Sequence, residues 1–457
     1  MPETTYKTES ENILPRTLSF TPVTKMQTSE DQDISYLLSL QAVRDRSQSV
    51  LKAAKEGALN NFDYHHERMP EVADFVLSVI SRDFGPDRFA EIPPHGRWQH
   101  FDVGGVDRIT PLLKKWESEG CDATERTRRL IDLFFVSVLL DAGAGDVWNF
   151  KEPTTGKTYG RSEGIAVASL YMFTAGVYST VERPKECVDG AGLTGLQEDV
   201  FSRYFQISSD NPMVGVSSRV KLLNNVGSSL LSLPKIFGPT GRPGNLVDFL
   251  IQASKEPQVL DYEVLWSALQ SVLIPSWPKD RTHIRGKPMG DAWPLKVLED
   301  RNQGDKETGG IQPFHKLTQW LGYSLTVPFV RVLGFRVVNG ELGTGLPEYR
   351  NGGLFVDLGV LQLKPAVLEQ GRKASGQDLP LYSPTGDVIV EWRAMTVALL
   401  DELYKLVSAH FAEKGVQFSM AQMLEAGTWK GGRELAAKHR PQTKSSPILM
   451  DGDGTLF

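Results

Sequence analysis

A chain of 457 residues with 40% apolar and 23% charged side chains has room for a sizeable core, in one large domain or two ordinary ones. Its net charge of −6 argues against a general nucleic-acid binder, because such proteins present a basic face. The two cysteines, Cys121 and Cys187, belong to no Cys-x-x-Cys or zinc-spaced pattern, which argues against a disulfide framework and favours a reducing compartment. We expect a cytoplasmic protein, with the nucleus left open, that needs no metal and no other cofactor.

The N-terminal residues 1–30 are polar and rich in Thr, Ser and Glu. They lack the basic and apolar regions of a signal peptide, so we expect a disordered segment. No apolar run approaches the length of a membrane span. The longest, residues 130–140, contains Asp132 and is predicted to be a buried helix. We expect no membrane partner, and a single helical catalytic domain over residues 31–457.

Helical periodicity dominates this domain. Helices are predicted at residues 34–60, 70–84, 107–119, 124–140, 165–178, 194–205, 216–231, 246–254, 262–273, 314–325, 389–412 and 420–439. Alternating aromatic residues on either side of Pro153-Thr-Thr-Gly156 predict a β-hairpin. The Pro/Gly-rich residues 277–313 are expected to wrap the surface, and the glycine-rich residues 341–361 to form short strands or a shaped loop. The pattern predicts a mainly α fold with a small β-hairpin and short strands.

The first candidate site follows the helix that ends near residue 140. Asp141 and Asp146 leave it through a glycine-rich turn, which allows close approach to a ligand. Trp148 and Phe150 are candidates to stack on a planar group. The structural alternative, a helix stop followed by hairpin core residues, is somewhat favoured by the sequence alone.

The second candidate is Gly160-Arg-Ser-Glu-Gly164. Backbone N–H groups at a helix start favour anions, and Arg161 would add positive charge. The alternative is a plain capping arrangement by Ser162, with Arg161 and Glu163 exposed. The sequence does not separate the two.

The third candidate lies on the helix predicted from residue 314. His315, Gln319 and Tyr323 are four residues apart and share one face, with Lys316 and Trp320 beside them. Such a stripe lines a pocket or forms the polar face of a half-exposed helix, and both interpretations stay open. A lone His315 is more often structural than catalytic.

The fourth candidate is the segment 343–357, which brackets Glu348, Tyr349 and Arg350 with glycines and a proline. The alternative is a polar surface turn. Glu391 and Arg393, at the start of the long late helix, are expected to form salt bridges within this group.

Several ordered motifs resemble the fungal and bacterial uracil-catabolism family (uracil catabolism protein 4-like), long catalogued only as a domain of unknown function. They span roughly residues 35–457 and comprise Gly96-Arg-Trp-Gln-His-Phe101, residues 140–148, Gly160-Arg-Ser-Glu-Gly164, residues 314–321 and the C-terminal Asp451-Gly-Asp-Gly-Thr-Leu-Phe457. This resemblance implies a part in uracil breakdown and leaves the reaction open.

A more distant resemblance is to the queuosine-salvage nucleosidases, helical enzymes related in fold to DNA glycosylases. Glu348-Tyr-Arg350 looks like their Asp-Tyr-Arg, and Phe314-His-Lys-Leu-Thr-Gln319 like their Phe-Tyr-Lys-Arg-Ala-Gln. Their Tyr-Trp pair at a helix start is replaced here by Arg161, Ser162 and Glu163. This departure implies a smaller, more polar leaving group than a deazapurine.

This resemblance implies a DNA-glycosylase-like helical fold and a set of site residues. Glu348 is expected to stabilise an oxocarbenium-like transition state, while Asp146 and Glu163, with Trp148, hold the leaving group. Lys316 and Arg350 are the phosphate candidates. The full predicted substrate-binding set is Trp148, Phe150, Arg161, Glu163, His315, Lys316, Gln319, Tyr349 and Arg350.

The expected function is hydrolysis of an N-ribosidic bond in a uridine-derived nucleotide or its ring-opened ribosylurea-type product. The expected partner is therefore a small nucleoside or nucleotide derivative, besides other enzymes of the uracil pathway. The alternative is a non-catalytic partner or carrier for the ring-opening enzyme, which would show an apolar surface patch instead of a polar pocket. An amidohydrolase is disfavoured because no His/Asp metal set is visible.

Overall fold

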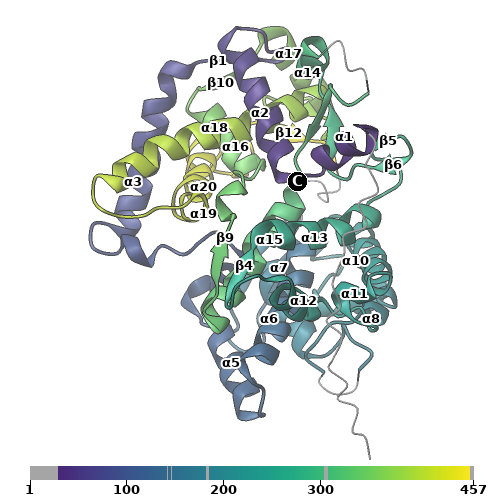
Figure 1. The fold of residues 1–457 in the computed structure, drawn as a ribbon. Helices are drawn as coiled ribbons and strands as arrows, with labels where there is room; N and C mark the ends of the chain where they lie inside the picture. The colour runs from purple at the N-terminus through teal and green to yellow at the C-terminus, as the bar shows by residue number, and fades with distance from the viewer. Residues whose placement is uncertain (1–28, 142, 146, 182–184, 303–306, 453–457) are drawn as a thin grey trace, which may run out of the picture.

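The computed structural model describes residues 29–141, 143–145, 147–181, 185–302 and 307–452. Over these ranges the chain is mainly helical and its strands pair only in two-stranded sheets (Figure 1). The predicted mainly α fold is confirmed, while its kinship with DNA glycosylases stays a prediction. The predicted disordered segment 1–30 lies outside the described residues, except that helix α1 begins at Ser29.

The predicted helices are present with shifted ends, but the one predicted over residues 34–60 is two helices. Up to residue 174 they are α1 (Ser29–Leu37), α2 (Leu40–Lys55), α3 (Met69–Phe84), α4 (Arg97–Phe101), α5 (Ile109–Ser118), α6 (Ala123–Leu139) and α7 (Arg161–Thr174). Then come α8 (Gly190–Thr194), α9 (Glu198–Tyr204), α10 (Val216–Leu231), α11 (Pro234–Phe237), α12 (Leu246–Ala253), α13 (Tyr262–Ser276) and α14 (Lys296–Arg301). The last are α15 (Lys316–Leu333), α16 (Tyr349–Asp357), α17 (Pro365–Ser375), α18 (Asp387–Ala412), α19 (Met420–Met423) and α20 (Trp429–His439). Of these helices, α4, α8, α11, α14, α16 and α17 were not predicted.

Short strands join distant parts of the chain. The antiparallel pairs are β1 (Phe62–Tyr64) with β10 (Leu361–Leu363), β2 (Asn149–Lys151) with β3 (Thr158–Gly160), β5 (His283–Ile284) with β6 (Lys287–Pro288), and β7 (Ala292–Pro294) with β8 (Ile311–Pro313). The parallel pairs are β4 (Val259–Asp261) with β9 (Arg336–Val338) and β11 (Leu381–Tyr382) with β12 (Leu449–Met450). The β2–β3 pair, in the register Phe150–Tyr159, confirms the predicted hairpin.

The first and the last described helices lie in the same half of the molecule. Figure 1 shows α1 to α3 beside α16 to α20 in its upper half, with α5 to α13 in its lower half and α15 where the halves meet. α18 packs against both α2 and α3. One cluster of buried apolar side chains extends from Leu40 to Ile448. The boundaries of the predicted single domain, residues 31–457, stay a prediction.

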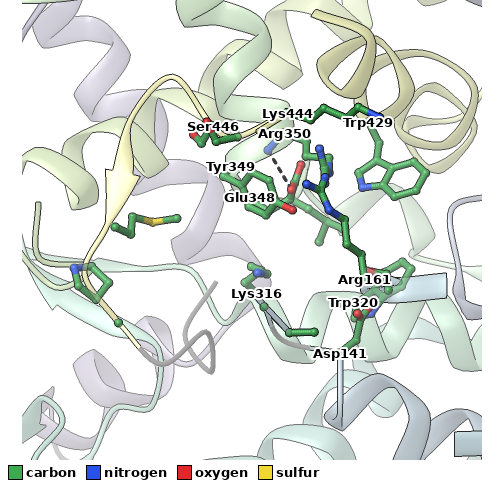
Figure 2. A pocket seen from close by; sticks show the side chains of 18 of the residues that line it. Asp141, Arg161, Lys316, Trp320, Glu348, Tyr349, Arg350, Trp429, Lys444 and Ser446 are labelled. Carbon is green, nitrogen blue, oxygen red and sulfur yellow. Dashed lines mark hydrogen bonds between the residues drawn. The ribbon is translucent and has the colours of Figure 1, made fainter. Parts of the chain in front are cut away.

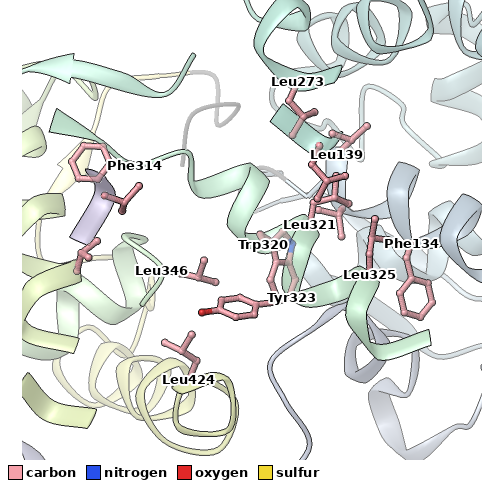
Figure 3. Close-up of a cluster of buried hydrophobic side chains, with 14 of the residues drawn as sticks. Phe134, Leu139, Leu273, Phe314, Trp320, Leu321, Tyr323, Leu325, Leu346 and Leu424 are labelled. Atoms are coloured by element: carbon pink, nitrogen blue, oxygen red, sulfur yellow. The ribbon is translucent and has the colours of Figure 1, made fainter. Parts of the chain in front are cut away.

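The central helix α6 shows why the core forms here. Asp122 caps it by accepting a hydrogen bond from the backbone N–H of Glu125 at 2.7 Å. Every residue from Leu130 to Leu139 is buried, so the helix is covered on all sides. It packs most extensively against α15, where Phe134 and Leu139 lie beside Leu321 and Leu325 (Figure 3). Each leucine buried in this contact contributes about 1.5–3 kcal/mol. The predicted buried helix is confirmed.

Two segments differ from the predictions. Residues 341–361 were expected to be strands or a loop, but they contain helix α16. The glycines there serve close helix packing: a Cβ on Gly352 would lie 2.7 Å from the Trp392 ring. Residues 277–313, expected at the surface, include the buried strand β8 and Asp291, which is 5% exposed.

A buried ion pair explains why Asp291 lies inside. Arg393 of α18 donates to its two carboxylate oxygens at 2.8 and 2.9 Å, and the backbone N–H of Lys316 donates to it at 2.9 Å. Burial alone would raise the pKa of Asp291, but Arg393 holds it well below its usual range.

Salt bridges of Glu391 and Arg393 within the 343–357 segment were expected. The ion pair of Arg393 is with Asp291, which fixes the start of α15, and its Nε donates a hydrogen bond to the Pro347 carbonyl at 3.4 Å. Glu391 accepts from the backbone N–H groups of Asn60 and Asn61 instead.

Within the described residues, no helix is both long enough and apolar enough to cross a membrane.

Candidate functional site

A pocket of about 320 Å³ opens where the two halves of the molecule meet. Its walls come from α4, the turn after α6, the start of α7, α15, α16, the start of α20 and the C-terminal residues 444–452. Figure 2 shows Lys316 and Trp320 reaching it from α15, and Lys444 and Ser446 from the C-terminal segment. Its volume suits a small metabolite.

Positive charge dominates the described lining. Four lining residues are cationic, namely Arg161, Lys316, Arg350 and Lys444, against two carboxylates, Asp141 and Glu348. Asp141 is already neutralised by Arg97, whose Nη1 lies 2.8 Å from it. The pocket therefore favours an anionic ligand.

Glu348 lies at the start of α16. One carboxylate oxygen accepts from the backbone N–H of Arg350 at 2.9 Å and the other from that of Asn351 at 2.6 Å. Glu348 is thus the N-cap residue of this helix. The side chain is half-buried and lines the pocket, so the carboxylate is held in one orientation facing the ligand space.

Lys316 is the first residue of α15. Its backbone N–H donates a hydrogen bond to the Asp291 carboxylate. Burial lowers the pKa of its ammonium to about 8, while the carboxylates of Glu348 and Asp141 act in the opposite direction. A lysine with such a pKa can give up and regain a proton near neutral pH.

Arg350 is a buried cation that has no counter-ion among the described residues. It is 6% exposed, and among the described residues its guanidinium has neither an ion pair nor a hydrogen bond. It lies 4.7 Å from the Tyr349 ring centroid. Burial raises the pKa of Tyr349, and the charges of Arg350 and Arg161 lower it, so both cations lie close to this phenol.

Arg161 begins α7 in a strained conformation, with φ at 53°. Gly160 before it gives no side-chain cap, so the first N–H groups of this helix are not satisfied by a capping side chain. Ser162, the next residue, also lines the pocket.

Four rings form an aromatic wall of the pocket: His95, His100, Trp320 and Trp429. Trp320 lies 4.6 Å from His95 and 5.6 Å from His100, between ring centroids. The corresponding distances from Trp429 are 5.9 and 5.5 Å. The sequence motifs contain only His100 and Trp320 of these four. No role follows from the spacing, because the rings come from α4 and the turn before it, from α15 and from α20.

Comparison with known proteins places the chain in a family. A family model described as "Protein of unknown function (DUF1688)" matches residues 36–457. The chain belongs to the DUF1688 family. It is 48% identical over 428 residues to Protein urg3 of Schizosaccharomyces pombe, covering 93% of this chain and 99% of the relative. It is 42% identical over 440 residues to Uracil catabolism protein 4 of Lachancea kluyveri, covering 93% and 99%. The predicted family membership is confirmed, and the likeness to nucleosidases stays a prediction.

The pocket of this DUF1688 member gathers five of the predicted site residues: Arg161, Lys316, Glu348, Tyr349 and Arg350. The predicted catalytic Asp146 lies outside the described residues, although Gly145 beside it lines the pocket.

The other predicted residues lie elsewhere. Trp148 and Phe150 are 1% exposed in the core, and the Trp148 indole N–H donates to the Phe205 carbonyl at 2.8 Å. Glu163 does not line the pocket; it pairs with Arg433 of α20. Trp148 and Phe150 are therefore core residues of the hairpin region, the structural alternative to stacking on a ligand.

The polar stripe predicted to line a pocket, His315, Gln319 and Tyr323, lies on the face of α15 next to the one that lines the pocket. His315 Nε2 lies 2.9 Å from the Leu37 carbonyl, and the Gln319 amide donates to the Thr344 hydroxyl at 2.9 Å. Both side chains are buried and neither lines the pocket. Lys316 and Trp320, one position further along, line it instead.

Proposed function

We propose that this pocket hydrolyses the N-ribosidic bond of a phosphorylated, uridine-derived compound in uracil breakdown. The substrate is a uridine nucleotide or its ring-opened ribosylurea-type product, and the products are the base, urea or a ureide together with ribose phosphate. The pathway is suggested by the name Uracil catabolism protein 4 of the Lachancea kluyveri relative. The reaction is suggested by one observation: Glu348 shares a pocket with Lys316 and with Arg350, which has no counter-ion in the part of the chain that the structure describes.

The bond cleavage needs a carboxylate and an acid on the two sides of the anomeric carbon. The bond from C1′ to the leaving nitrogen breaks, its electron pair goes to nitrogen, and C1′ becomes oxocarbenium-like. Glu348 stabilises this cation and accepts a proton from water, whose oxygen bonds to C1′. Lys316, largely protonated at neutral pH with a pKa of about 8, gives the leaving nitrogen its proton.

The phosphate is assigned to Arg350. A buried guanidinium without a counter-ion is costly, and a phosphate that binds it in two-pronged fashion removes that cost. The Tyr349 hydroxyl, Arg161 and Lys444 line the same pocket and add donors. This arrangement favours a 5′-phosphorylated substrate over the free nucleoside.

The test is an incubation of purified protein with uridine, UMP, ribosylurea and ribosylurea 5′-phosphate, followed by mass spectrometry for released base or urea and free sugar. We expect release from a phosphorylated substrate. Glu348→Gln should reduce it by at least about 10³-fold, as expected for loss of the carboxylate on which the transition state depends.

Because Glu348 also caps α16, Glu348→Ser serves as the second variant: serine retains a capping oxygen but no carboxylate. Glu341→Gln, on the exposed turn before this segment, is the matched control and should keep full activity. Full activity in Glu348→Ser would refute the assignment. No release from any of the four compounds would favour the alternative, a partner of the ring-opening enzyme, to be sought by pull-down of that enzyme.

A further inference from the structure

The aromatic wall contains one histidine that the protein leaves unsatisfied. His100 is 5% exposed, and its Nδ1 is fully enclosed without a hydrogen-bond partner in the described residues. Its neighbour His95 is different: Nδ1 of that ring lies 2.6 Å from the Glu425 carboxylate. Nδ1 of His100 is closed off from the pocket, so Nε2, which has no hydrogen bond in the described residues either and is not enclosed in this way, is the atom of His100 that can meet a ligand.

Charge at this position identifies the kind of ligand. Burial lowers the pKa of His100 and Arg97 lowers it further, although Asp141, Glu163 and Glu425 act in the opposite direction. The ring is therefore neutral at pH 7, with one nitrogen as donor and the other as acceptor. Its Nε2 can donate to a C=O or accept from an N–H, and a neutral amide-like group offers both.

The two tryptophans define the shape of the ligand. Trp320 and Trp429 approach His100 edge-on, with interplanar angles of 84° and 73°. Arg433, paired with Glu163, lies 4.7 Å from the Trp429 ring centroid and holds this ring in place. A π-helical turn, Leu424–Thr428, immediately precedes Trp429; such turns are frequent at functional sites. Aromatic walls of this kind favour flat ligands.

The position of the wall relative to the charged residues fits one ligand orientation. Asp141 acts electrostatically on both His100 and Lys316, and Glu348 acts on both Lys316 and Tyr349. Trp320 stands one helical turn after Lys316 on α15. The aromatic wall therefore adjoins Lys316 on α15.

We propose that His100, Trp320 and Trp429 form a subsite for the neutral planar leaving group, with a C=O or an N–H of a uracil ring or a ureide hydrogen-bonded to Nε2 of His100. The assignment as a leaving-group site rests on the proposed function. The binding of a flat neutral amide does not depend on it.

Binding to the full chain tests the subsite directly, with uracil and N-methylurea as probes and dihydrouracil as the non-aromatic comparison, measured by calorimetry. We expect uracil to bind at least about tenfold more tightly than dihydrouracil, since stacking needs a flat ring. His100→Phe keeps the ring and removes both nitrogens, and should weaken uracil binding about tenfold or more. His100→Gln, which restores a donor and an acceptor, should recover part of it.

Matched variants distinguish this outcome from misfolding. Trp429→Leu should weaken the binding of uracil more than the binding of N-methylurea. His66→Gln, at an exposed position, should change the binding of neither probe. His100→Phe should not lower the midpoint of unfolding, because it removes an unsatisfied polar group. Failure of both probes to bind at about 10 mM, a concentration that detects millimolar affinity, would overturn the subsite, as would unchanged binding in His100→Phe.

The hydrolysis assay keeps the two proposals apart. If uracil binds through His100 and no substrate is cleaved, the subsite stands and the hydrolase fails. If a substrate is cleaved and His100→Phe leaves both kcat and KM unchanged, the hydrolase stands and the subsite fails.

Discussion

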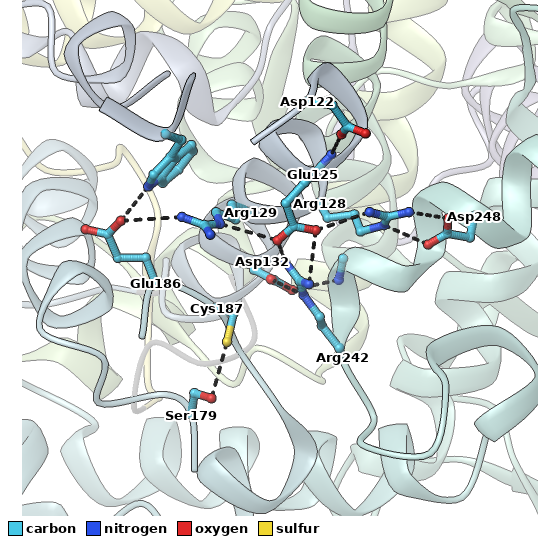
Figure 4. A network of polar contacts seen from close by, with 12 residues as sticks. Asp122, Glu125, Arg128, Arg129, Asp132, Ser179, Glu186, Cys187, Arg242 and Asp248 are labelled. Atoms are coloured by element: carbon cyan, nitrogen blue, oxygen red, sulfur yellow. Dashed lines mark hydrogen bonds and ion pairs between the residues drawn. The ribbon is translucent and has the colours of Figure 1, made fainter. Parts of the chain in front are cut away.

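Two polar regions of the molecule differ in whether a largely buried arginine has counter-ions. Around α6, Arg242 lies between Asp132 and Glu125, at 2.8 and 3.0 Å, and the backbone N–H of Gly244 completes the contacts of Asp132 (Figure 4). In the pocket, Arg350 has no such partner among the described residues. The saturated network holds helices and loops together, whereas the unsatisfied one is ready for a ligand. Burial of a charge alone therefore does not reveal its role; the presence or absence of protein partners does.

Replacing Arg242 or Arg350 by methionine should give the largest difference between the two regions in the free energy of unfolding. Arg242 belongs to the network around α6. Arg242→Met leaves Asp132, which is fully buried, without its counter-ion. We expect the free energy of unfolding to fall by about 3–5 kcal/mol, measured by urea denaturation. A fall below about 1 kcal/mol would mean that the network is not a structural element.

Arg350→Met should leave the free energy of unfolding unchanged or raise it, because an uncompensated buried charge is replaced by an apolar side chain. It should abolish stabilisation by ribose 5-phosphate, which in the unmodified protein amounts to about 2.7 kcal/mol at a concentration of 100 times Kd. Thermal shifts with ribose 5-phosphate and ribose at constant ionic strength measure both effects. Retention of the ribose 5-phosphate shift in the variant would remove Arg350 from the phosphate site.

The pH dependence of turnover tests Lys316. If its ammonium is the acid, the rate should fall about tenfold per pH unit above a pKa of about 8. Titration of Lys316 would not cause this fall in rate by unfolding the protein. Folding lowers its pKa, so the unfolded chain binds more protons and this contribution to the free energy of unfolding rises with pH between the two pKa values. A rate that stays flat from pH 7 to 10 would exclude Lys316 as the acid.

Arg336 gives the smallest expected effect and shows that pairing matters chiefly when it is buried. It lies 3.2 Å from Glu256, and the two side chains are 63% and 69% exposed. Arg336→Ala should change the free energy of unfolding by less than about 0.5 kcal/mol, by the same urea titration. A loss of unfolding free energy as large as that of Arg242→Met would contradict the expectation that buried ion pairs contribute more to stability than exposed ones.

Local chemistry in the sequence determined much of this protein. The capped helix after Asp122 and the hairpin around Pro153 follow from capping preferences, apolar periodicity and turn residues, all of which act between near neighbours. Glu348, Tyr349 and Arg350 reach the pocket together because they are consecutive.

Only the tertiary structure decided which faces meet. Periodicity correctly grouped His315 with Gln319 and Lys316 with Trp320, but it does not say which pair meets Leu37 and Thr344 and which the pocket. Likewise, His100 and Trp429 are 329 positions apart and meet only because α4 and α20 pack around the same space. Helical period fixes relative direction along one element, while contacts between elements depend on how the whole core closes.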